Sequence, residues 1–84
     1  MTIRELFSCI DTECCTRIQI VTLKYKTFYL NVEWENDQNP DLNVFDRIAE
    51  FRIEGWYVTI DGMIVIRSYD SPNPQLIEFI EEVL

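Results

Sequence analysis

The chain contains no histidine, only two glycines and three cysteines, and these scarcities limit the chemistry open to it. Histidine is the usual general base and a common metal ligand, while phosphate-binding loops need closely spaced glycines. The composition therefore argues against an enzyme, and we expect no metal and no cofactor. Cys9, Cys14 and Cys15 are odd in number and two of them are adjacent, which does not support a disulfide framework. We interpret them as free thiols, with a thiol or metal role as the alternative.

Basic residues are also scarce, since seven lysines and arginines stand against fifteen aspartates and glutamates, a formal net charge of −8. Such a charge repels phosphate backbones and anionic lipids. We therefore expect no direct binding to nucleic acid and none to a membrane. The acids have two interpretations: they keep a small protein in solution, or they form a face for a partner protein with a basic surface.

Long apolar runs are missing as well. No run approaches the ~20 residues that a membrane helix requires, and the N-terminus lacks the basic-then-apolar layout of a signal peptide. The expected location is the cytoplasm, or the host cytoplasm if a phage encodes the chain. Apolar residues nevertheless make up 48% of the 84 residues, which predicts one folded domain over residues 1–84 with a small core.

The clearest local signal is the run GWYVTIDGMIVIR, from Gly55 to Arg67. Two apolar, β-rich segments flank Asp61-Gly62, a pair that suits a two-residue type I′ turn. That turn predicts a hairpin with Ile60 opposite Met63. Both faces of this hairpin are apolar, so other elements must cover it.

A second hairpin is predicted from residues 17–23 and 27–35, which are also β-rich. The second of these segments alternates apolar and polar residues strictly, as a strand with one buried face does. Lys24 and Lys26 lie in the intervening turn, where they would oppose edge-to-edge pairing.

Helices are predicted at both ends of the chain. Thr2 and Glu5 form a capping box, which begins a first helix with an apolar stripe. Asn73 followed by Pro74 has the order of a cap and a first helical residue, which begins the last helix.

A middle helix is predicted over residues 42–54, with Asp41 as its cap and Gly55 just beyond its end. Alternating apolar residues leave a strand over residues 48–54 as an open alternative. The resulting order, αββαββα, predicts a single small α+β domain: a four-stranded, mainly antiparallel sheet of two hairpins packed with helices.

Acidic residues recur on the polar side of the predicted middle helix. Asp46, Glu50 and Glu54 stand at i, i+4 and i+8, which would place their carboxylates in a row at about 6 Å intervals. That interval approaches the spacing of phosphates along a nucleic-acid strand. A second group surrounds the loop before this helix and could join the row into one acidic face: Glu33, Glu35, Asp37 and Asp41.

The opening TIREL, followed by strands, an acidic loop and a small α+β body, resembles short acidic proteins of phages and mobile elements, among them some anti-CRISPR inhibitors. The resemblance implies a non-catalytic inhibitor that mimics nucleic acid and occupies the channel of a nuclease. The residues that would bind this protein partner are Glu33, Glu35, Asp37, Asp46, Glu50 and Glu54.

A structural or accessory role is the alternative to this acidic binding module. In that case the chain would bury surplus apolar side chains in a homodimer or in a larger complex, and the candidates for that contact are Trp34, Trp56, Tyr57 and Phe79.

Overall fold

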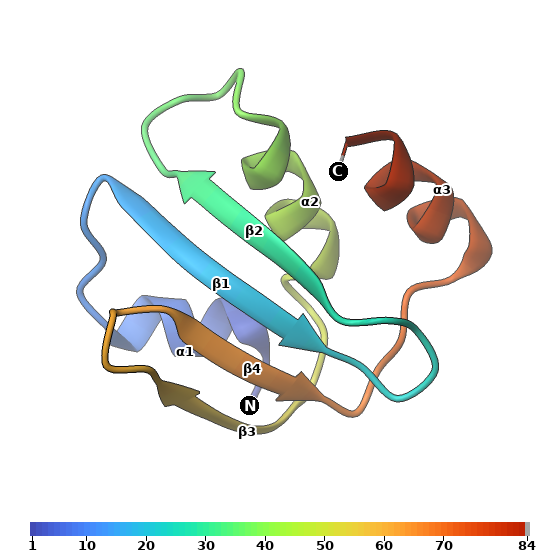
Figure 1. Ribbon diagram of the computed structural model, residues 1–84, viewed down its shortest axis with the longest axis horizontal. Coiled ribbons are helices and arrows are strands. Elements are labelled where there is room, and N and C mark those ends of the chain that lie inside the picture. The colour runs from blue at the N-terminus through green and yellow to red at the C-terminus, as the bar shows by residue number, and fades with distance from the viewer. Residues whose placement is uncertain (84) are drawn as a thin grey trace.

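The computed structural model describes residues 1–83, in which three helices pack on a four-stranded sheet in the order αββαββα (Figure 1). This arrangement confirms the predicted α+β class. The elements are α1 (Ile3–Cys9), β1 (Cys15–Val21), β2 (Phe28–Glu33), α2 (Pro40–Ile48), β3 (Ile53–Val58), β4 (Ile64–Ser68) and α3 (Pro74–Val83).

The sheet has the strand order β2-β1-β4-β3. Each predicted hairpin forms an antiparallel pair, β1 with β2 and β3 with β4, but the two hairpins join through a parallel pairing of β1 with β4. The sheet is therefore mixed. β4 is a central strand, and Ile64, Val65 and Ile66 are all buried. Ile64 and Ile66 belong to the core, whereas Val65, on the other face, lies between Gln19 of β1 and Tyr57 of β3.

One face of the sheet packs on the helices. Ile18 and Ile20 of β1 are buried in a core with Ile3 of α1 and Val44 of α2, whereas Arg17, between buried neighbours, lies exposed on the opposite face. β2 shows the same alternation. The strict alternation in residues 27–35 therefore predicts the buried face of β2 correctly.

The turn of the β3–β4 hairpin differs from the prediction. Val58 pairs with Ile64, one residue away from the predicted register. The Gly62 N–H bonds to the Thr59 carbonyl at 3.0 Å, so residues 60–62 form a three-residue turn. Gly62 has φ +89°, and no other residue among 1–83 has a positive φ, which excludes the type I′ turn.

The shifted register has a local cause in the side chain of Thr59. Its hydroxyl accepts the Met63 N–H at 3.0 Å and donates to the Asp61 carboxylate, which stabilises the longer turn. As a result Trp56 and Val58 share a face with Ile64 rather than with Met63.

The middle helix is shorter than predicted, and the helix predicted for residues 49–54 does not form. α2 ends at Ile48, because the following segment has distant backbone partners: Ile3 N–H bonds to the Phe51 carbonyl at 3.0 Å, and Ile53 N–H bonds to the Met1 carbonyl at 2.8 Å. Gly55 lies within β3 instead of ending a helix. The strand alternative for residues 48–54 is correct from Ile53 onward.

The cap of α2 is also displaced from the predicted Asp41. Asn39 caps the helix, since its Oδ1 accepts the Leu42 N–H at 2.8 Å, and Pro40 occupies the first helical position. The two other predicted helix starts are confirmed. The Thr2–Glu5 capping box is present in α1, and Asn73 accepts the Leu76 N–H at 2.8 Å before α3.

Candidate protein-binding surface

The predicted row of acidic residues does not form, because α2 ends before it is complete. Asp46 lies on α2, Glu50 follows the helix and bonds to Arg4 at 2.6 Å, and Glu54 lies on β3 with its Oε1 4.0 Å from Arg67. The three carboxylates therefore belong to three different parts of the fold. The prediction that Glu54 lies on the middle helix is therefore wrong.

The second acidic group is divided between structural and exposed roles. Glu33 accepts a hydrogen bond from the Asn39 amide at 2.7 Å, while Glu35 and Asp37 lie exposed in the β2–α2 loop. Asp41 accepts the Asn31 N–H at 2.6 Å. The structure thus does not bring the six predicted binding residues into one face.

These hydrogen bonds close the outer edge of β2 from Asn31 to Glu33. The outward N–H groups of Asn31 and Glu33 meet side-chain acceptors, Asp41 Oδ2 at 2.6 Å and Asn39 Oδ1 at 3.3 Å. Both acceptors come from the start of α2, which packs beside β2 (Figure 1). An edge whose donors are occupied in this way is a poor template for another strand.

The outer edge of β3 is open over its second half. Met1 and Ile3 pair with residues 51–53 and cover only its beginning. The Thr59 N–H points inward to Met63 at 2.9 Å, so the alternation of an antiparallel strand turns the amides of Trp56 and Val58 outward. These amides have no hydrogen-bond partner among residues 1–83. We use the name β3 edge for the backbone from Trp56 to Val58.

Large apolar side chains surround the β3 edge. Trp56 is 42% exposed, Tyr57 56%, Val58 54%, and Ile60 in the turn is fully exposed. Apolar residues concentrated on one strand and its turn mark interaction sites more often than scattered ones do. Two of the aromatic residues predicted for an interface, Trp56 and Tyr57, are therefore available for contact.

The other two predicted interface aromatics are committed within the domain. Trp34 packs edge-on against Phe45, with ring centroids 4.8 Å apart, and its indole N–H bonds to the Thr16 hydroxyl at 2.8 Å. Phe79 lies beneath the Arg47 guanidinium, 4.5 Å from its ring centroid. Leu23, Tyr29 and Tyr69 are exposed elsewhere, but only Trp56, Tyr57, Val58 and Ile60 lie close together, on β3 and its turn.

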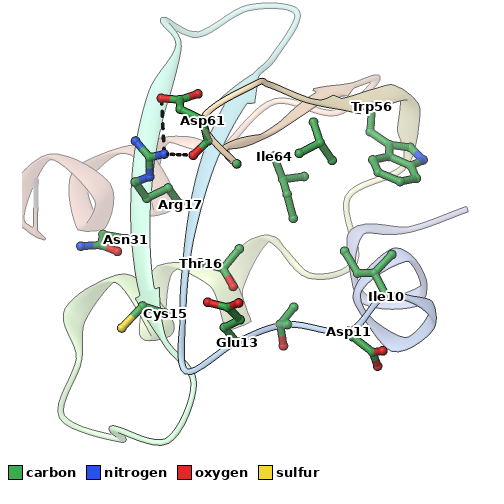
Figure 2. A pocket seen from close by; sticks show the side chains of 13 residues that line it. Ile10, Asp11, Glu13, Cys15, Thr16, Arg17, Asn31, Trp56, Asp61 and Ile64 are labelled. Atoms are coloured by element: carbon green, nitrogen blue, oxygen red, sulfur yellow. Dashed lines mark hydrogen bonds and ion pairs between the residues drawn. The ribbon is translucent and has the colours of Figure 1, made fainter.

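A groove of about 600 Å³ adjoins the β3 edge, between the α1–β1 loop and the β3–β4 hairpin; we refer to it as the β3 groove. Figure 2 shows Ile10 and Trp56 at one end, Ile64 in the middle and Arg17 joined to Asp61 at the other end. The groove is also lined by the residues Asp11, Thr12, Glu13, Cys15, Thr16, Asn31, Val58 and Gly62.

Both ends of β3 are anchored by carboxylates. At its start, Asp70 binds the Arg52 guanidinium at 2.8 Å and the Arg52 N–H at 2.7 Å, and these two contacts lower the pKa of Asp70. At its end, the Thr59 hydroxyl lowers the pKa of Asp61, which also pairs with Arg17 at 3.3 Å. The open β3 edge is therefore held in place while its outer side is unpaired.

The thiols show no sign of a reactive or metal-binding centre. Cys9, Cys14 and Cys15 are free and exposed. Partial removal from water raises the pKa of the Cys15 thiol, with the neighbouring Cys14 and Glu33 acting in the same direction, which is opposite to the shift of a reactive cysteine. Within residues 1–83 no group of three Cys, Asp or Glu side chains is placed to hold a metal ion.

Comparisons with family models, with curated proteins and with solved structures found no match to this chain. The resemblance to phage and anti-CRISPR proteins therefore stays a prediction. None of the helices within residues 1–83 is both long enough and apolar enough to cross a bilayer.

Proposed function

We propose that this chain is a non-catalytic protein-binding module that pairs its β3 edge with an extended segment of a partner protein. The observation that carries the proposal is the unpaired backbone of Trp56 and Val58 on a strand with exposed apolar side chains. In strand addition, main-chain hydrogen bonds supply affinity and alternate side chains supply specificity. The absence of histidine from the sequence supports a binding role over a catalytic one.

Charge supports a basic partner segment over a second copy of the chain. Each copy carries a formal charge of −8, so two copies repel each other, whereas a segment with lysine or arginine among apolar residues is attracted.

A selection with short random peptides displayed on phage tests the proposal. Peptides are selected on the wild-type protein and on Val58→Pro, which removes one outward N–H without breaking a bond to β4, because proline is tolerated on edge strands. We expect basic, apolar peptides that bind the wild type and lose at least about tenfold in affinity on the variant. In hydrogen exchange, such peptides should protect the Trp56 and Val58 amides.

A second variant covers the case in which Val58→Pro fails to fold. Val58→Lys keeps the N–H and adds a positive charge that repels a basic segment, and circular dichroism checks that both variants keep the fold. Peptides that bind the wild type and both folded variants equally would contradict the proposal. Concentration-dependent dimers in sedimentation, abolished by Val58→Lys, would contradict it too, since the occupant would then be a second copy.

An inhibitor that mimics nucleic acid is the second candidate function. It is favoured by Glu35, Asp37 and Asp46, which are exposed and have no ion-pair partner among residues 1–83. Its test is salt-sensitive binding to purified CRISPR nucleases. The triple replacement of these acids by Gln or Asn should abolish that binding and leave binding at the β3 edge unchanged, whereas a nuclease bound equally by wild type and triple variant would exclude the mimic.

A further inference from the structure

The β3 groove lies directly beside the β3 edge, because Trp56 and Val58 belong to both. We infer that this groove receives a lysine or arginine side chain of the docked segment, an inference that rests on the proposed function. Side chains of a strand alternate between its two faces, so every second residue of a segment paired with β3 would project toward the side of the sheet on which Trp56 and Val58 lie. A long side chain from that position can enter the groove.

The walls of the groove suit the aliphatic part of such a side chain. Ile10 and Trp56 stand at one end and Ile64 lies in the middle (Figure 2), with Val58 completing the apolar lining. Lysine and arginine bury their methylene stems along apolar surfaces of this kind and keep the charged head in water. The face of an indole ring also attracts a cation, more strongly than the other aromatic rings do.

The charges of the groove select the cationic head. Asp11 and Glu13 line it and have no ion-pair partner among residues 1–83. Arg17 does not pair with them; its guanidinium instead bonds to the backbone carbonyl of Asp61 and pairs with the Asp61 carboxylate (Figure 2).

Other side chains fit the groove less well. A purely apolar side chain would remove the carboxylates of Asp11 and Glu13 from water without giving them a partner, which costs free energy. An acidic side chain would be repelled by them. A side chain with an apolar stem and a cationic head can contact the apolar walls and also pair with Asp11 or Glu13.

The test uses the phage-displayed peptides that bind the wild type and lose affinity on Val58→Pro. These peptides should share a lysine or arginine at one position, and replacing it by norleucine should weaken binding to the wild type at least about tenfold. On the double variant Asp11→Asn/Glu13→Gln the same replacement should change affinity less than about twofold, since the partners of the cation are gone.

A matched control separates local pairing from net charge. Glu78→Gln/Glu82→Gln removes two charges from α3, which lies away from the β3–β4 turn (Figure 1), and should leave the cost of norleucine unchanged. Peptides that need β3 but lack a preferred basic position, or whose preference survives Asp11→Asn/Glu13→Gln, would overturn this inference and leave the proposed function standing. If no peptide depends on Val58, the proposed function fails and this inference fails with it.

Discussion

The two outer strands of the sheet, β2 and β3, differ in whether the outward amides along their edges have hydrogen-bond partners. β2 presents the outward amides of Asn31 and Glu33 to Asp41 and Asn39, and it buries Phe28, Leu30 and Val32 under the helices. β3 leaves the amides of Trp56 and Val58 unpaired and its apolar side chains half in water. An exposed apolar edge invites association, and natural proteins usually block one. Since the chain blocks one edge and not the other, the open edge is the better candidate for binding.

The largest expected effect comes from comparing two valines on these strands. Val32 on β2 is completely buried, whereas Val58 on β3 is 54% exposed. Val32→Ala should lower the free energy of unfolding by about 2–3 kcal/mol, because it leaves a cavity in the core. Val58→Ala should cost less than about 1 kcal/mol. Urea denaturation of both variants measures the difference.

Equal losses of unfolding free energy in Val32→Ala and Val58→Ala would contradict the difference between the two strands. They would mean that Val58 is buried in solution, as in a dimer formed through β3. Repeating the denaturation at several protein concentrations identifies that case, because the stability of a dimer rises with concentration and that of a monomer does not.

Much of the fold follows from local sequence signals. Alternation in residues 27–35 predicts β2, and the capping box at Thr2 predicts α1. The Asn-Pro pair at Asn73 predicts the start of α3, and the same pair at Asn39 marks the start of α2, where Asp41 was predicted instead. The sequence signal is the same at both helix starts, because an Asn-Pro pair supplies the cap and the first helical residue at each.

The errors around β3 have a different physical origin. Phe51 and Ile53 are strand-like because they pair with the N-terminal segment, nearly fifty residues earlier in the chain, and helical periodicity does not detect such partners. The predicted row of Asp46, Glu50 and Glu54 does not form for the same reason, because it requires a helix that continues to residue 54. The turn was misjudged because Asp-Gly also fits a three-residue loop, in which Gly62 alone takes a positive φ.

The candidate binding surface was only partly predictable. The sequence shows that both faces of the β3–β4 hairpin are apolar and names Trp56 and Tyr57 as contact candidates, but not which strand is central. The parallel pairing of β1 with β4 decides this, since it buries β4 and leaves β3 at the edge. The β3 groove depends on the same pairing, which brings Arg17 next to Asp61.

A smaller effect should separate the two Asn-Pro caps. Asn73 caps α3, so Asn73→Ala should cost about 1 kcal/mol of unfolding free energy. Asn39 caps α2 and also accepts the Glu33 N–H of β2, so Asn39→Ala should cost about 2 kcal/mol. Thermal or urea denaturation measures both variants. Equal losses would show that Asn39 contributes nothing to closing the β2 edge.

The smallest effect concerns the pH dependence of the anchor at the start of β3. Contacts with Arg52 lower the pKa of Asp70 in the folded state, so Asp70 stabilises the fold above its unfolded pKa of about 3.9. This contribution is lost as the pH falls through the lower, folded pKa. It should be smaller than the effect of the Asn39 cap, because the Arg52 side chain is 68% exposed and solvent screens the pair.

Asp70→Asn isolates this contribution from the other carboxylates. Wild type and variant should differ in unfolding free energy near pH 6, and the difference should shrink toward zero as the pH is lowered to about 2. Asp37→Asn, which removes the same charge from an exposed loop position, serves as the control and should show no such convergence. A difference in unfolding free energy between wild type and Asp70→Asn that stays constant over this range would mean that the contacts of Asp70 with Arg52 do not depend on the charge of the carboxylate. In that case the open β3 edge would keep its anchor even in acid, and binding at β3 should persist there as long as the fold does.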